Sequence, residues 1–130
     1  MLTVGISDTF NSRLIKPLIH RLRPCNEPSM QGEVVNIVHC GSGFSFASSH
    51  AANHFAVAVS LILFIFQGKK NIKYWLLFWA GLVAYSQVYV GVHYPFDVFI
   101  GAILGSLVAW LVWKMAYAKN LDKLEHGRHG

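Results

Sequence analysis

Three long apolar segments constrain this chain more than any other feature of its sequence. They are residues 47–67, 74–92 and 98–113. Each is close to the ~20 residues that a helix needs to cross ~30 Å of hydrocarbon, and the last can continue to residue 118 if Lys114 snorkels. A soluble helical bundle would show a polar face with a period of about 3.6 residues, whereas the run FAVAVSLILFIF shows almost none. We therefore predict an all-α, polytopic transmembrane bundle with three full spans.

Composition and charge agree with a membrane setting. Hydrophobic residues make up 54% of the chain and charged residues only 13%, against about 45–50% and about 25% in ordinary globular domains. The net charge of +5 suits anionic membrane lipids as partners. Nucleic-acid binding would need a clustered basic patch with interleaved aromatic residues, which the sequence lacks. No nucleic-acid partner is expected.

The distribution of basic residues predicts an orientation. Lysines are concentrated in the turn at residues 68–73 and basic residues recur in the C-terminal tail, and cytoplasmic loops are rich in such residues. Both segments are therefore expected inside. Alternation of the three spans then places His50 and the turn from His93 to Asp97 together on the outer side.

The segment KPLIHRLRP carries the first group of candidate site residues. Lys16 and Arg23 are seven residues apart, so on a helix ended by Pro24 they would lie two turns apart on one face. Both would lie on the outer side, against the usual distribution of basic residues, which favours an anionic ligand. A planar guanidinium and an ammonium together can grip a phosphate. The alternative is a basic cluster that meets lipid headgroups.

The segment FASSHAANHF carries the second group. Ser48 and Ser49 precede His50 where the first full span begins, so their hydroxyls and the free N–H groups of a helix N-terminus would point at one place. Such a terminus suits an anion. The alternative is an N-cap serine followed by an unrelated histidine.

The segment SQVYVGVHYPFD carries the third group. His93 and Asp97 flank Pro95, which suits the first turn of the last span. A carboxylate four residues from an imidazole can accept its Nδ1–H, leave Nε2 as a nucleophile and stabilise the charge that develops. The alternative is an interfacial pair without chemistry, although polar groups at membrane depth are costly and favour a functional role.

Together these groups resemble the type 2 phosphatidic acid phosphatase superfamily, whose motifs are KxxxxxxRP, PSGH and SRxxxxxHxxxD. The first motif is complete. The second keeps its serine and histidine but has Ala47 for proline and Ser49 for glycine, and the third has Gln87 for arginine. The motif order and spacing agree over about 80 residues.

The resemblance implies a metal-independent lipid phosphatase that needs no cofactor. His93 would attack phosphorus and form a phosphohistidine, Asp97 would orient the ring, and His50 would protonate the leaving alcohol and then activate water. The phosphate-binding residues would be Lys16, Arg23, Ser48, Ser49 and Gln87. The substrate would be an isoprenyl diphosphate, phosphatidylglycerol phosphate or a similar lipid phosphate. The protein would lie in a bacterial plasma (inner) membrane with its active site on the outer (periplasmic or extracellular) side.

Gln87 leaves a second function open. Its amide can donate one hydrogen bond but not the bidentate, charged contact of an arginine, and losing a comparable donor costs about 10²–10³ in rate. Either Arg21 or His20 compensates, or the substrate and rate differ. The alternative function is therefore a weakened or inactive family member, or a fragment, that binds anionic lipid headgroups.

The family usually has six transmembrane helices, with the first motif at the end of the third. The chain is therefore expected to begin inside the third helix and to lack the first two. We predict a membrane-embedded domain over residues 1–118 that is incomplete at its N-terminus, followed by a cytoplasmic basic tail over residues 119–130.

Two residue pairs remain. Cys25 and Cys40 fall in the outer segment, where a disulfide would tie down the connecting loop; free thiols or a zinc site with His20, His39 or His54 are the alternatives, although the spacing matches no common zinc pattern. Gly101 and Gly105 form a GxxxG pair that suits close packing, either within the bundle or in a homo-oligomer.

Overall fold

The protein is described by a computed structural model. The described residues are 2–10, 13, 16–30, 32, 39–41 and 43–126. The α-helices are α1 (Leu2–Phe10), α2 (Lys16–Ile19), α3 (Ser49–Phe64), α4 (Lys70–Tyr89) and α5 (Pro95–His126), and two short 3₁₀ turns are η2 (Pro24–Asn26) and η3 (Pro28–Met30). These residues contain no strand. The fold is therefore all-α over the described ranges, as predicted.

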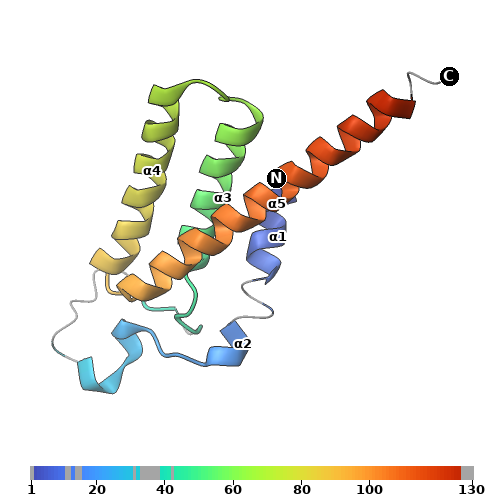
Figure 1. The fold of residues 1–130 in the computed structure, drawn as a ribbon. Coiled ribbons are helices and arrows are strands. Elements are labelled where there is room, and N and C mark those ends of the chain that lie inside the picture. The colour runs from blue at the N-terminus through green and yellow to red at the C-terminus, as the bar shows by residue number, and fades with distance from the viewer. Residues whose placement is uncertain are drawn as a thin grey trace.

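The long helices bring one end of the molecule together. In Figure 1, α3 and α4 form an antiparallel hairpin, α5 crosses it diagonally, and α1 packs beside α3 and α5. The start of α3, the end of α4 and the start of α5 meet at the end where α2, η2 and η3 also lie. We call this the motif end, because all three sequence motifs reach it. The turn between α3 and α4 lies at the opposite end.

Small residues allow α3 and α5 to approach closely. A Cβ atom on Gly105 would lie 1.9 Å from the Ala52 carbonyl oxygen, and one on Gly101 would lie 2.5 Å from the Ser48 carbonyl oxygen. Both glycines are buried, and Ala51 and Ala52 facing them are fully buried. Packing within the bundle is therefore confirmed. A homo-oligomer through these glycines finds no support here, because α3 occupies their face within the chain.

The helices differ in how well they fit a bilayer. Residues Pro95–Asn120 of α5 form a segment of 26 residues with a mean hydropathy of 2.0, long and apolar enough to cross a membrane. Helix α3 is apolar but has only 16 residues. Helix α4 has 20 residues but begins at Lys70, before the predicted start at residue 74, and so includes Lys73 as well. Among the described helices, α5 alone meets both the length and the hydropathy requirement.

The predicted helix over residues 16–23 is wrong. Helix α2 ends at Ile19 and His20 has a φ of 48°. Arg23 is extended, with φ −75° and ψ 151°, because Pro24 disfavours helical geometry in the residue before it. The Arg21 carbonyl instead accepts the Ser45 N–H at 2.8 Å, so this segment pairs with the loop that precedes α3. Lys16 and Arg23 therefore do not share a helical face.

Candidate active site

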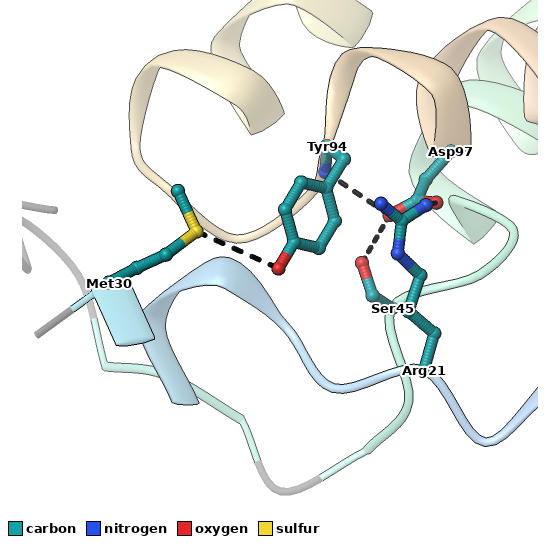
Figure 2. A network of polar contacts seen from close by, with 5 residues as sticks. All are labelled: Arg21, Met30, Ser45, Tyr94 and Asp97. Atoms are coloured by element: carbon teal, nitrogen blue, oxygen red, sulfur yellow. Dashed lines mark hydrogen bonds and ion pairs between the residues drawn. The ribbon is translucent and has the colours of Figure 1, made fainter. Parts of the chain in front are cut away.

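At the motif end, the carboxylate of Asp97 accepts three hydrogen bonds. It lies in the first turn of α5 and its side chain is 0% exposed. Oδ1 accepts a hydrogen bond from Arg21 Nη1 at 3.0 Å. Oδ2 accepts one from the Tyr94 N–H at 3.1 Å and another from the Ser45 hydroxyl. Figure 2 shows these donors converging from three separate segments of the chain.

Arg21 is fixed by a second contact. Its Cζ lies 3.9 Å from the centroid of the Tyr94 ring, a cation–π geometry. The Tyr94 hydroxyl in turn donates to Met30 Sδ at 3.7 Å, so η3 supports the ring (Figure 2). Arg21 and Tyr94 thus form one wall around Asp97.

His93 lies in the turn between α4 and α5 and is only 3% exposed. Gly91, with a φ of 70°, ends α4 in a backbone conformation that favours glycine. The N–H groups of Val92 and His93 both donate to the Gln87 carbonyl, at 3.2 and 3.1 Å. The main chain of Gln87 therefore fixes the position from which His93 extends.

Ser48 joins the second motif to the third. It is the N-cap of α3, its hydroxyl accepts the Ala51 N–H at 3.4 Å, and its own N–H donates to the Asp97 carbonyl at 3.0 Å. Accepting a hydrogen bond leaves the hydroxyl proton for donation to a phosphate oxygen. Ser49 and His50 follow in the first turn of α3, and His50 is exposed. The first turns of α3 and α5 are thus directly bonded.

Arg23 lies two residues before a cross-linked loop. A disulfide joins Cys25 to Cys40, with Cα atoms 6.1 Å apart, and Asn26 Nδ2 donates to the Gly41 carbonyl at 3.2 Å. Arg23 Nε donates to the Gly43 carbonyl at 3.0 Å, and burial lowers the pKa of its guanidinium from the ordinary value. The disulfide is one of the alternatives predicted for these cysteines.

The same loop is attached to the turn that carries His93. The Cys25 N–H donates to the Gly91 carbonyl at 3.2 Å. The disulfide loop therefore packs on the α4–α5 turn at the motif end. Arg23 lies just before this loop, whereas the side chain of Lys16 lies outside the described part of the structure.

Gln87 is half-buried at the end of α4. Its Nε2 donates to the Ser86 hydroxyl at 3.4 Å, and that hydroxyl donates to the Val83 carbonyl at 2.7 Å. Arg21, named from the sequence as a group that could compensate for Gln87, instead pairs with Asp97. Within the residues that the structure describes, no three His, Cys, Asp or Glu side chains gather as a metal site would require.

Sequence reasoning missed Ser45 and Tyr94. Ser45 is fully buried on Asp97, yet it lies outside the motifs and 52 residues away along the chain. Tyr94 stands inside the third motif, but only its backbone N–H and ring face contribute. An aromatic residue three positions before an aspartate is not a sequence pattern that predicts a ring contact with a distant arginine.

Comparisons with known proteins all indicate the same family. The family model described as the PAP2 superfamily matches residues 1–121. A lipid A 4'-phosphatase of Bacteroides thetaiotaomicron is 37% identical over 118 residues, which cover 89% of this chain and 52% of the relative. Phosphatidylglycerophosphatase B of Bacillus subtilis is 34% identical over 86% of this chain and 54% of its own length.

A solved structure shares the fold. The transmembrane PAP2 type phosphatidylglycerolphosphate phosphatase from Bacillus subtilis superposes with a TM-score of 0.68 at 31% sequence identity, covering 90% of this chain and 57% of that one. The chain spans about half the length of the curated relatives that it matches.

Proposed function

Because the chain belongs to the PAP2 superfamily, we propose that it is a membrane lipid phosphatase that hydrolyses a lipid phosphomonoester or diphosphate. The observation that carries this proposal is the meeting of the three motifs at one end of the bundle. There His93 and Asp97 are buried, and Ser48 is hydrogen-bonded to the Asp97 main chain. Buried polar groups at membrane depth are costly, so their convergence from distant segments of the chain favours a chemical use.

The reaction would proceed in two transfers. In the first, His93 Nε2 forms a bond to phosphorus as the bond to the lipid oxygen breaks, while His50 protonates that oxygen. In the second, His50 takes a proton from water, whose oxygen attacks the phosphohistidine and releases phosphate and free His93. Asp97 would orient the imidazole and stabilise its positive charge.

The remaining motif residues would hold the phosphoryl oxygens. Positioning and electrostatic stabilisation supply most of the catalysis in phosphoryl transfer. Arg23 would supply a fixed cation from the segment next to the disulfide loop, and the Ser48 hydroxyl would supply a donor. Lys16, Ser49 and Gln87 would complete the set.

The substrate class follows from the relatives. Their names include lipid A 4'-phosphatase, undecaprenyl-diphosphatase and phosphatidylglycerophosphatase B. Each name describes removal of phosphate from a lipid phosphate or diphosphate. An isoprenyl diphosphate, phosphatidylglycerol phosphate or a related lipid phosphate is therefore the proposed substrate.

We assign α3, α4 and α5 to three membrane spans in the inner membrane of a bacterium. The motif end would then face the outer side, the α3–α4 turn with its lysines would face the cytoplasm, and residues 119–130 would form a cytoplasmic tail. Exposed aromatic residues at both ends of α4 support this assignment, because such residues favour the membrane–water interface. They are Tyr74, Trp75, Tyr85 and Tyr89.

Phosphate release from a lipid phosphate in buffer that contains a chelator tests the proposal. The wild-type chain should release inorganic phosphate, and His93→Ala and His50→Ala should abolish release because each removes a group that makes or breaks bonds. His39→Ala, at an exposed histidine of the disulfide loop, serves as the matched control. Turnover that survives in His93→Ala, or that requires added zinc, would overturn the mechanism.

A second function is favoured by Gln87, whose amide contacts Ser86 and carries no charge. In that case the chain would bind anionic headgroups without turning them over. Sedimentation with vesicles that contain phosphatidic acid, together with no phosphate release from any lipid phosphate, would identify this function.

A further inference from the structure

We propose that Arg21 is a positioning residue that holds the Asp97 carboxylate in the orientation that His93 requires. This inference rests on the proposed function, and it assigns a role to Arg21, which stands at an unspecified (x) position of the first motif, KxxxxxxRP. Arg21 lies two residues before the motif arginine, Arg23, on the extended segment that replaces the predicted helix. The inference is supported by the contacts around the buried carboxylate of Asp97.

The contacts of Asp97 leave it one further acceptor position. A carboxylate has about four lone-pair positions, two on each oxygen. On Oδ2, the Ser45 hydroxyl and the Tyr94 N–H fill both. On Oδ1, Arg21 Nη1 fills one. The three donors therefore fix the plane of the carboxylate and leave the second lone pair of Oδ1, which we assign to the Nδ1–H of His93.

Arg21 is the charged member of this set. Asp97 is 0% exposed, and a buried carboxylate without a cation is strongly disfavoured. The Arg21 side chain is 39% exposed, so its outer part remains in contact with the surroundings while Nη1 reaches the carboxylate. Ser45 and the Tyr94 N–H are neutral donors and cannot balance the charge.

Tyr94 makes this position selective for arginine. Its ring lies against the guanidinium at 3.9 Å, and it belongs to the same turn as Asp97. A planar guanidinium can stack on a ring and donate in its own plane at the same time, whereas an ammonium does this less well. Ring and carboxylate therefore fix the guanidinium in one orientation.

The same geometry separates Arg21 from the phosphate-binding set. One guanidinium face is covered by Tyr94 and one nitrogen is used by Asp97. Arg23 is the arginine that the family motif assigns to phosphate. Loss of Arg21 should therefore impair the chemical step rather than substrate binding.

The test is a kinetic comparison of Arg21→Gln, Arg21→Lys, Asp97→Asn and the double variant Arg21→Gln/Asp97→Asn, measured under single-turnover conditions on one lipid phosphate. We expect Arg21→Gln to lower the maximal rate by about 100-fold, the scale of a misplacement of about 1 Å, with KM changed less than about twofold. Arg21→Lys should recover part of the rate. The double variant should match Asp97→Asn within about twofold, because Arg21 acts through Asp97.

Two further variants complete the design. Arg13→Gln, at an exposed arginine, is the matched control and should behave as wild type. Ser45→Ala removes a neutral donor from the same carboxylate; if Arg21→Gln does not fold, Ser45→Ala should lower the maximal rate without a change in KM.

The contrary results are distinct. Full additivity of Arg21→Gln and Asp97→Asn, or a rise in KM without a fall in maximal rate, would overturn the role of Arg21. Failure of the wild-type chain to release phosphate would instead overturn the proposed function, and the role of Arg21 with it.

Discussion

Gln87 contributes to the fold through its main-chain carbonyl, and only its side chain can contribute to the chemistry. Its carbonyl accepts the N–H groups of Val92 and His93 and so shapes the turn before the proposed nucleophile. Any residue type offers that carbonyl. The half-buried amide donates only to Ser86, where the family motif has an arginine. A substitution at this position can therefore change the chemistry without removing the turn.

We predict that Gln87→Arg raises the maximal rate of phosphate release by at least about tenfold. A charged, bidentate donor to an oxyanion raises the rate by about 10²–10³-fold. The predicted gain is smaller, because the longer arginine side chain has to reach the phosphate from position 87. Steady-state kinetics on a lipid phosphate would measure the change.

Gln67→Arg is the matched control, because Gln67 is exposed at the opposite end of the hairpin. It should leave the rate unchanged. Equal rates in Gln87→Arg and wild type would show that position 87 does not face the phosphate.

The sequence predicts part of the residue-scale picture. The four-residue spacing places His93 and Asp97 in one turn, and both are buried there. The partners of Asp97 could not be predicted, because Arg21 and Ser45 lie 76 and 52 residues away from it. Contacts of that range depend on how the segments before α3 fold back, which no local pattern specifies.

At the scale of elements, the contact between α3 and α5 depends on glycine. We predict that Gly105→Ala destabilises the protein by about 1–3 kcal/mol, because the new Cβ would meet the Ala52 carbonyl oxygen at 1.9 Å and the helices must separate. Thermal unfolding in detergent micelles, followed by circular dichroism, would measure the loss.

Gly81→Ala is the matched control for this substitution. Gly81 lies inside α4, and a Cβ there would meet nothing within 4 Å. Alanine favours a helix over glycine by about 1 kcal/mol, so this variant should be as stable as wild type or more stable. Equal losses at the two positions would show that helix propensity or lipid contact, rather than packing on α3, decides the effect.

The disulfide loop is a second element that can be tested alone. Reduction of Cys25–Cys40, which are 15 residues apart, should lower the free energy of unfolding by about 3 kcal/mol. Activity should fall as well, because Arg23 lies just before this loop and the Cys25 N–H joins the loop to Gly91. Thermal unfolding and phosphate release would be measured with and without dithiothreitol.

The double variant Cys25→Ser/Cys40→Ser controls for other effects of the reductant. It should match the reduced wild-type chain and should not respond to dithiothreitol. If reduction leaves both stability and activity of the wild type unchanged, the loop is held by its hydrogen bonds alone.

Elements were predictable where one local signal dominates. Pro95 begins α5 as expected, and apolar runs mark α3 and α4 although α4 starts earlier than predicted. The segment over residues 16–23 was not predictable from the spacing of Lys16 and Arg23. There Pro24 and the bond between the Arg21 carbonyl and the Ser45 N–H outweigh the helical periodicity.

At the scale of the whole molecule, the two ends of the bundle differ in chemistry. The motif end holds the buried carboxylate of Asp97, the Cys25–Cys40 disulfide, Arg21 and Arg23. The opposite end holds Lys69 in the turn between α3 and α4 and Lys70 at the start of α4. Helix α4 has 20 residues and therefore spans about 30 Å, so the two ends are separated by about the thickness of a bilayer. A fixed orientation in the membrane would place them in different compartments.

We predict that the motif end lies outside and the α3–α4 turn inside. The native cysteines form a disulfide, so a single introduced cysteine is the reactive thiol in each variant. Ser29→Cys in η3 should react with a membrane-impermeant maleimide on intact cells, whereas Asn71→Cys should react only after lysis. Both positions are exposed, so accessibility of the side chain does not distinguish them. The wild-type chain is the blank, and a fluorescent protein fused to the C-terminus should fluoresce, because in the proposed orientation α5 would return the chain to the cytoplasm. The reverse labelling pattern would place the candidate active site on the cytoplasmic side, and labelling of both variants on intact cells would contradict the three-span arrangement.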